Sequence, residues 1–528
     1  MARFMAPTRY GVRTLRSPGE KQTAGVYDST AIYAGDLAAN FITGNTMNPA
    51  TMWFDPYMSD ANGKRRKDAV AEWLEESRDR MMAQLANSLY YAEASESMID
   101  YLVFGTHSLI GEEAPALPNQ DKGGFRGYYW HADRIGRFAI SEGPDGMVDT
   151  NYRLFRGAAR TFAARFGLEN MSDGVRAQIA NQGGDRFMDM IHAIEPRPMG
   201  EQRRGSLAKS MPITSAWVER ESKHVVKEGG YSRFPSANSR YRKTPGEVYG
   251  RGRGEIAFPD TRTGNRAMQM SFEDWSLKIR PPVLTRHDSV IGSLRLVPGG
   301  NTSVRTVGGP PSDSVQAFQT GSHPEVSQIM MADIRAGINR AFYVDQLIAL
   351  MEVQKTEMTA FEYAKKIELL FRILGPVYAN FEHSFLGEVV DIAWQVGMEG
   401  GLFSDPPEEI YETDGTIEVE FNNPIARAQK AGDVEAIQLA INDMAPLAEI
   451  DPSIFDRLDM DGLVDTIFDV RGVPAKAQRG EDEVAQIRQQ RAQQAQEQQM
   501  MAEAGAVAEG LNKTAPMVSA LSDAGVGG

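Results

Sequence analysis

The sequence contains no cysteine. This absence excludes disulfides and thiolate metal sites, and it fits a protein assembled in a reducing cytoplasm. No run of about 18 apolar residues occurs either, so we expect no membrane span. The N-terminus has no apolar core after its arginines, so we expect no secretory signal. The seven histidines form no His-x-x-x-His or His-Glu-x-x-His pair, which leaves no zinc-site pattern.

Motifs for nucleotide binding and nucleophilic catalysis are also missing. The chain has no Gly-x-x-x-x-Gly-Lys-Ser/Thr and no Gly-x-Ser-x-Gly sequence. Asp456, Asp459 and Asp461 resemble part of a calcium loop, but Arg457 stands where an EF-hand needs an oxygen ligand. We interpret these carboxylates as flanking a helix. The sequence therefore predicts no catalytic residues, no metal, no cofactor and no enzymatic activity.

Basic residues are in deficit, at 56 against 71 acidic ones, and the formal charge is −15. A protein that grips nucleic acid usually has the opposite balance, because neutralising phosphates supplies its non-specific affinity. The expectation is different for a protein channel through which DNA passes, because an acidic channel wall repels phosphates and lets DNA slide. The hydrophobic content of 42% fits a globular protein, and 528 residues are too many for one simple core.

The longest periodic stretch is 359–396, where apolar residues recur every three or four positions and so share one helical face. Thr359 and Glu362 offer a capping box at its start. Gly375 and Pro376 interrupt it, because proline has no N–H to donate within the helix, so we expect a kink there. A long bent helix with one apolar stripe is typical of a large α-rich scaffold.

Other segments before residue 260 give mixed signals, and together they predict an α+β arrangement. We expect 101–105 and 109–111 to be short strands or a helix end. We predict helices at 27–41, 67–100 and 152–166, the second with Val70, Trp73, Leu74, Met81, Leu85 and Leu89 inward, and strands at 138–140 and 217–226.

Beyond residue 260 the pattern is helix, short β-rich segment, helix. We predict a helix at 260–280 ended by Pro281 and Pro282, strands within 283–323, and a helix at 324–343. In that last helix Val326, Ile329, Met330, Ile334 and Ile338 should face inward. Further predictions are a helical run at 347–351, a strand at 417–421, helices at 425–431, 434–448 and 462–469, and a polar segment at 481–503 that is either a helix packed among copies or a disordered tail.

The run Gly250-Arg251-Gly252-Arg253-Gly254 permits three interpretations. It could be a phosphate-binding loop, an RNA-binding element, or a turn that leads into a helix. The Gly-x-Gly-x-x-Gly spacing is missing, so we favour the turn.

Several motifs, in order along nearly the whole chain, resemble the head-to-tail connector (portal) proteins of short-tailed, T7-like bacteriophages. Each is weak alone, but their order and spacing are specific. They are Asn48-Pro49 with Trp53-Phe54; Tyr249-Gly250-Arg251-Gly252 with Ala257-Phe258-Pro259-Asp260; Met358-Thr359-Ala360, Glu362, Glu368, Leu374-Gly375-Pro376-Val377 and Leu386; and Arg427-Ala428-Gln429-Lys430-Ala431-Gly432, Asp451-Pro452 and Gly472-Val473-Pro474.

The resemblance implies an α-rich α+β portal fold with a wing, a helical stem, a small β-containing clip, a helical crown and a C-terminal barrel. Its parts would be an arm at 1–25, the first part of the wing at 26–255, stem helices at 256–281 and 324–343 around the clip at 282–323, a tunnel loop at 344–357, the kinked long helix and strand of the wing at 358–422, the crown at 423–475, the barrel helix at 476–510 and a tail at 511–528.

The resemblance also implies a function. The protein would form a ring, of twelve copies in the family, at one capsid vertex, nucleate head assembly and pass double-stranded DNA during packaging and ejection. Its partners would be the terminase large subunit, tail or adaptor proteins, and major capsid and scaffolding proteins, in a virion assembled in the host cytoplasm. By position, the DNA channel would include Gln354, Lys355, Thr356, Arg335 and Arg340, and the docking clip Arg286, His287, Arg295 and Arg305.

Two alternatives remain open on the sequence. One is another virion structural protein, such as an internal head or tail-adaptor subunit with long helices. The other is a metal- or nucleotide-dependent nucleic-acid enzyme, which would need a metal and phosphate cradle that the sequence does not reveal.

Overall fold

The computed structural model describes residues 1–9, 21–59, 65–66, 68–115, 124–198, 210–279, 283–285, 305, 309–310, 315–317, 324–353, 378–412, 416–422, 437, 439–444, 459, 462–464, 467–468, 484–494, 496, 498 and 500. The chain divides into two units. The first comprises Met1–Phe54, Asp79–Phe403 and Phe421–Gln429; the second comprises Asp55–Arg78, Ser404–Glu420 and Lys430–Gly528.

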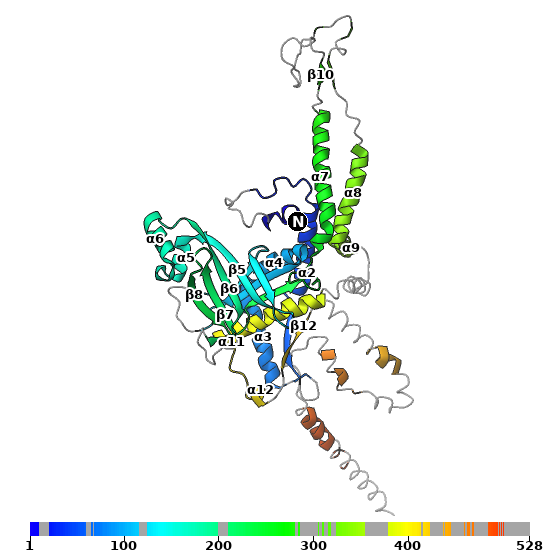
Figure 1. Cartoon of the computed structure of the whole chain (residues 1–528). Coiled ribbons are helices and arrows are strands. Elements are labelled where there is room, and N and C mark those ends of the chain that lie inside the picture. Colours follow the sequence, from blue (N-terminus) through cyan, green and yellow to red (C-terminus); the bar gives the residue numbers. More distant parts are fainter. Residues whose placement is uncertain are drawn as a thin grey trace, which may run out of the picture. The chain divides into compact units, whose positions relative to one another are not determined.

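A five-stranded antiparallel sheet dominates the first unit, with strand order β4-β5-β6-β7-β8 (Figure 1). Each strand pairs with its sequence neighbour, and two short helices between β5 and β6 pack on one face around Phe162, Met171, Met190, Trp217 and Val226. The elements are β4 (Phe138–Glu142), β5 (Val148–Ala158), α5 (Ala159–Phe166), η2 (Leu168–Asn170), α6 (Asp173–Gln182), β6 (Phe187–Pro196), β7 (Ile213–Glu219) and β8 (Val225–Tyr231).

Two predictions in this region are wrong in part. The predicted helix at 152–166 is helical only from Ala159, because the preceding residues pair as β5 with β4 and β6. The pairing buries Arg153, whose partner Asp133 comes from another sheet, so local periodicity did not reveal it. The predicted strand at 217–226 is two strands, β7 and β8, separated by a turn with Lys223 at φ +56°.

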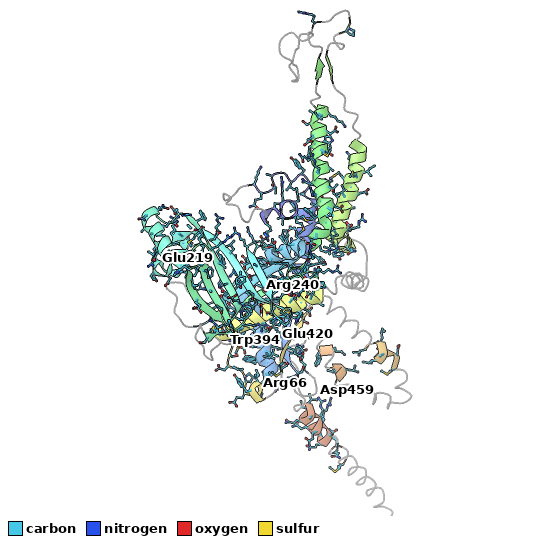
Figure 2. The ribbon with its side chains drawn as sticks, in the orientation of Figure 1. Arg66, Glu219, Arg240, Trp394, Glu420 and Asp459 are labelled. Carbon is cyan, nitrogen blue, oxygen red and sulfur yellow. The ribbon has the colours of Figure 1, made fainter. Side chains whose placement is uncertain are left out.

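A buried carboxylate fastens that turn to α6. Glu219, labelled in Figure 2, accepts hydrogen bonds from the Ser172 N–H at 2.9 Å and from the Ser222 hydroxyl at 2.6 Å. The contacts satisfy a carboxylate that is only 2% exposed.

The second sheet of this unit has three antiparallel strands in the order β3-β2-β9, and helices pack against it. His107 of the sheet packs against the rings of Phe381 and Phe385, which belong to the helix at 378–400, and this helix contains a π-helical turn. The elements are α4 (Tyr90–Phe104), β2 (Thr106–Glu113), β3 (Tyr128–Asp133), β9 (Ser236–Arg240), the π-helical turn η5 (Glu382–Gly387) and α11 (Glu388–Gly400).

The apolar stripe of the long helix is confirmed where it is described. Phe381, Phe385, Val389 and Ile392 are at most 2% exposed. Residues 354–377 lie outside the described part of the chain, so the expected kink at Gly375 and Pro376 stays a prediction.

The helical tract predicted from 67 to 100 is two helices, α3 (Ala69–Asn87) and α4. Between them the Ser88 hydroxyl accepts a hydrogen bond from the Tyr90 N–H at 3.1 Å, and Leu89 is 63% exposed rather than buried. Ser88 thus competes with helix continuation, as serine does at helix starts. Residues 101–104 form the helix end, closed by Gly105 at φ +89°.

The remaining helices of the first unit match the predictions more closely. The predicted helix at 27–41 is α2, and the two helices on either side of the β-rich segment are α7 and α8. α7 begins earlier than predicted and contains Pro259. The bounds are α1 (Ala2–Met5), η1 (Pro7–Arg9), α2 (Thr30–Thr46), α7 (Arg253–Ile279), β10 (Val283–Thr285), β11 (Val315–Ala317), α8 (Pro324–Ala341) and α9 (Val344–Val353).

The inward face predicted for α8 is wrong in part. Ile329 and Met330 are 67% and 52% exposed, whereas Met331 and Ile338 are buried. The helix packs against both α7 and α2, so a stripe chosen by periodicity alone did not fix which sides are covered.

In the second unit, β12 (Ile417–Phe421) confirms the strand predicted at 417–421, and it pairs with β1 (Phe54–Met58), a strand that the sequence did not reveal. Asp55 accepts hydrogen bonds from Arg65 at 2.6 Å and Arg78 at 2.7 Å. The unit also contains the short helix α12 (Glu409–Glu412).

Asp459, labelled in Figure 2, accepts a hydrogen bond from the Gly462 N–H at 3.0 Å at the start of a helical turn. This confirms the helix-flanking interpretation for Asp459, whereas Asp456 and Asp461 lie outside the described residues. Residues 484–494 are helical, which favours the helix over the disordered tail there. Most of the predicted helices at 425–431 and 434–448 lie outside the described residues.

Candidate functional site

The helices α7 and α8 form an antiparallel pair that carries two of the predicted site residues. They lie side by side in Figure 1, with β10 beyond their far end. Glycines bring them close together: a Cβ at Gly264 would lie 2.9 Å from Ile334 Cγ2, and one at Gly337 would lie 2.8 Å from Asp260 Oδ2. Larger side chains at these positions would separate the helices.

The N-terminal segment fastens the base of this pair. Asn265 of α7, which is 7% exposed, accepts a hydrogen bond from the Tyr27 N–H at 2.7 Å and donates one to the Gly25 carbonyl at 3.2 Å. Arg335 of α8 donates from Nε to Asp28 Oδ2 at 2.9 Å. One short segment therefore holds both helices.

Asp28 is ionised in this arrangement. Burial alone would raise its pKa, but hydrogen bonds from the Thr30 hydroxyl at 2.5 Å and the Thr30 N–H at 2.8 Å, together with Arg335, lower the pKa below its usual value. The charge on Asp28 therefore keeps Arg335 in place, although the Arg335 side chain is still 43% exposed.

The glycine-rich run at 250–254, which leads into α7, packs closely against the end of α4. A Cβ at Gly252 would lie 2.6 Å from the Gly105 nitrogen, and the Gly250 N–H donates to the Thr106 hydroxyl at 2.8 Å. These backbone groups are occupied and enclosed, so they do not form an open phosphate cradle. The interpretation as a turn that leads into a helix is confirmed.

The outer half of α7 carries large apolar side chains that no described part of the chain buries. No residue from Arg266 to Ile279 is buried, although the sequence there is rich in large apolar side chains. Single exposed apolar residues are ordinary, but this hairpin carries several large ones, and such an accumulation is typical of interaction surfaces. The exposed set on the two helices is Met270, Phe272, Trp275, Leu277, Ile279, Ile329 and Met330, with exposures between 41% and 79%.

The other predicted site residues are only partly described. Arg340 is exposed and donates from Nε to the Ala336 carbonyl at 3.3 Å, and Arg305 is exposed. Arg335 and Arg340 share α8, but Arg335 acts as an anchor for Asp28. Gln354, Lys355, Thr356, Arg286, His287 and Arg295 lie outside the described residues, so their roles stay predictions.

Sequence reasoning missed Asn265. Its partner Tyr27 lies 238 positions away, so no local spacing marks the contact. No sequence signal marked Asn265, because the change of α7 from buried to exposed at this point is visible only in the structure.

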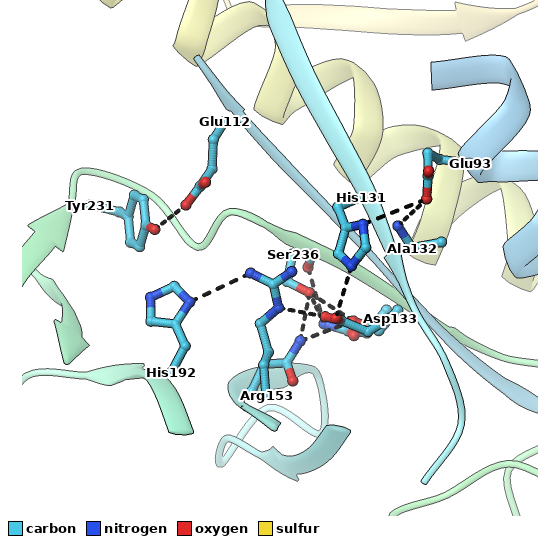
Figure 3. A network of polar contacts seen from close by, with 12 residues as sticks. Glu93, Glu112, His131, Ala132, Asp133, Arg153, His192, Tyr231 and Ser236 are labelled. Carbon is cyan, nitrogen blue, oxygen red and sulfur yellow. Dashed lines mark hydrogen bonds and ion pairs between the residues drawn. The ribbon is translucent and has the colours of Figure 1, made fainter. Parts of the chain in front are cut away.

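A buried polar network joins the two sheets of the first unit (Figure 3). Arg153 on β5 donates to Asp133 on β3 at 2.6 Å, and its guanidinium lies 3.5 Å from His192. His192 in turn lies 2.8 Å from the Ser215 hydroxyl. Asn151 adds hydrogen bonds from β5 to β2 and β9.

His192 and Ser215 in this network are arranged like a catalytic base and a nucleophile, but their surroundings do not suit catalysis. Burial, helped by Arg153, lowers the pKa of His192 well below its usual value, so the ring is neutral. A catalytic base needs an acceptor to orient it, whereas His192 faces a cation, and Ser215 is 8% exposed. The network is a structural link, and it gives no support to the enzyme alternative.

The described residues contain neither a metal-binding group nor a helix suited to a membrane. No group of three or more His, Asp or Glu side chains in these parts is arranged to hold a metal ion. Nor does any described helix combine the length and apolarity that a membrane span requires.

Comparison with known proteins decides the family. The family model described as bacteriophage head to tail connecting protein matches residues 1–478. The chain belongs to this family. The family is structural, so the expectation of a protein without catalytic activity agrees with it.

Two relatives cover almost the same range. A probable portal protein of Bordetella phage BPP-1 is 28% identical over 494 residues, which is 92% of this chain and 86% of the relative. The portal protein of Salmonella phage epsilon15 is 23% identical over 501 residues, with 93% and 86% covered. A chain in the solved neck of an empty GTA particle is 12% identical, with 79% of this chain and 87% of that chain covered, but its TM-score is only 0.33.

Proposed function

We propose that this connector-family protein is the portal of a bacteriophage. It forms a ring at one capsid vertex, at the head-tail junction, and DNA passes through the ring during packaging and ejection. The observation that carries the proposal is the family match over residues 1–478, and it is supported by the similarity of this chain to a probable portal protein and a portal protein over 86% of the length of each.

The uncovered half of α7 supports assembly into a ring. Side chains such as Trp275 and Ile279 are exposed to solvent in a single subunit. Burying them between subunits would gain about 25 cal/mol of free energy per Å² of apolar surface. When each copy contacts the next through two different surfaces, the contact repeats and closes into a ring if the rotation permits.

The elements fit the parts of a portal. α7 and α8 would be the stem, β10 and β11 the clip that docks the terminase large subunit and later tail or adaptor proteins, and α9 would lead to the tunnel loop. Arg335 and Arg340 would then lie in the stem, near the channel. Capsid and scaffolding proteins would contact the sheet-containing part, and the helix at 484–494 would belong to the barrel.

Native mass spectrometry and single-particle imaging of the purified protein test the proposal. We expect closed rings with a central opening, and particle imaging should place the protein at a single vertex. A protein that remains monomeric or dimeric at every salt concentration would contradict it. A location throughout the head interior would instead favour the internal-protein alternative.

A further inference from the structure

One face of the five-stranded sheet is hollowed. Register places Arg156 on β5 opposite Asp189 on β6, and Leu154 belongs to the same face because side chains alternate along a strand. Phe155, opposite Met190, points to the other face, which α5 and α6 cover. The first face bounds a hollow of about 740 Å³ beside the turn before β4.

Arginines rim this hollow in excess of carboxylates. Arg156 and Arg220 are 35% and 57% exposed and share the single carboxylate of Asp189, at 3.7 Å and 2.9 Å. Arg137 is exposed and makes no ion pair with another described residue. This local positive charge is notable because the chain as a whole carries −15.

The lining between the arginines is apolar and aromatic. Ile135, Leu154 and Ile191 are half-buried there. Tyr152 and Tyr249 also line the hollow, and they are 39% and 40% exposed. Arginine and tyrosine are the residue types that most often dominate the binding energy of protein interfaces.

We propose that this hollow is a docking site for an acidic segment of another virion protein. The segment places an apolar or aromatic side chain over Leu154 and Ile191, and its carboxylates accept hydrogen bonds from Arg137 and Arg220. Naming the partner as a virion protein rests on the proposed function; the site itself rests on the hollow and its charges.

A protein segment fits better than nucleic acid. A phosphate backbone needs a row of cations and donors along its track, and it gains little from an apolar lining. Here the arginines lie around one open hollow with an apolar lining, so a single segment can make charged and apolar contacts together.

The test uses the full-length assembled protein and a labelled peptide of alternating glutamate pairs and single phenylalanine or leucine residues. Fluorescence anisotropy should detect binding, and Arg137→Glu with Arg220→Glu should weaken it by at least about tenfold, because like charges then meet. The matched control is Arg160→Glu with Arg176→Glu on α5 and α6, two exposed positions where the same charge change should leave binding unaltered.

Further probes separate the alternatives. An oligoglutamate of equal length should bind more weakly than the mixed peptide. Equal binding would mean that the apolar lining of the hollow contributes nothing, and it would overturn the proposal. The proposal would also be overturned if the mixed peptide did not bind, or if Arg137→Glu with Arg220→Glu left its binding unchanged. If that variant instead loses binding of a single-stranded DNA oligonucleotide while peptide binding persists, the site is one for nucleic acid. Ring formation is measured separately by native mass spectrometry, so failure of the proposed portal function can be distinguished from failure of the docking site.

Discussion

At the scale of single residues, an ion pair buried in the first unit holds the N-terminal arm. Arg9 donates from Nε to Asp100 Oδ1 at 2.9 Å and from Nη1 to Glu96 at 2.6 Å. Burial raises the pKa of Asp100 to about 6, although Arg9 and the Ile135 N–H act in the opposite direction. The pair therefore titrates near neutral pH rather than in strong acid.

The pH dependence of arm docking follows from this pair. Without Arg9 the pKa of Asp100 would be higher still, so a docked Arg9 favours ionised Asp100. Docking is therefore strongest above the undocked pKa and weakens as pH falls through about 6.

Hydrogen–deuterium exchange at residues 2–9, corrected for intrinsic rates, should show faster exchange at pH 5 than at pH 8. Asp100→Asn should exchange fast at both pH values. A wild-type arm with the same protection at both would contradict the prediction.

Arg335 provides a second test at this scale. Arg335→Gln leaves the buried Asp28 carboxylate without its cation and should lower the free energy of unfolding by about 1 kcal/mol. Arg340→Gln removes only an exposed side chain with one backbone contact and should change little. Urea denaturation measures both variants, and equal effects would show that the Asp28 contact is not stabilising.

At the scale of elements, α7 combines a covered base with an uncovered outer half. The base is fixed by close helix contacts and by Asn265, whereas the outer half exposes Trp275 and Ile279 at 43% and 79%. Changes in the outer half should therefore act on assembly and leave the subunit fold intact.

Trp275→Glu with Ile279→Glu should abolish or strongly reduce ring formation, because charges would have to be buried at the contact. Circular dichroism should be unchanged, since neither residue is buried in the subunit. Asn181→Glu with Gln182→Glu on α6 is the control, with two exposed residues and the same charge change. Rings of normal size and stability in the α7 variant would contradict this surface as a contact.

At the scale of the whole molecule, the chain belongs to a structural family, that of bacteriophage head to tail connecting proteins. If DNA moves through a ring of such chains, as proposed, we expect the energy to come from a partner that hydrolyses nucleotide.

The assembled protein alone should show neither ATP hydrolysis nor DNA cleavage above background. Phosphate release and plasmid nicking assays measure both activities. Activity that remains with the assembled protein after a second purification would support the enzyme alternative.

The sequence by itself determined the family, the α+β class and most helices. Motif order survives over the whole chain, and apolar stripes such as Phe381 to Ile392 repeat with the period of a helix because burial of one face demands it. Asp459 as a helix-flanking residue was also readable, because its contact is local.

Only the tertiary structure decided which helical faces are covered and which strands pair. Ile329 and Ile338 look alike in sequence, yet one is 67% and the other 2% exposed, because coverage depends on a neighbour far along the chain. The same holds for Arg153, Asn265 and the arginine-rimmed hollow. Their partners meet only when sheets and helices pack: Asp133 lies 20 positions from Arg153, and Tyr27 lies 238 positions from Asn265. In both cases the partner belongs to another element, so no spacing within one helix or strand encodes the contact.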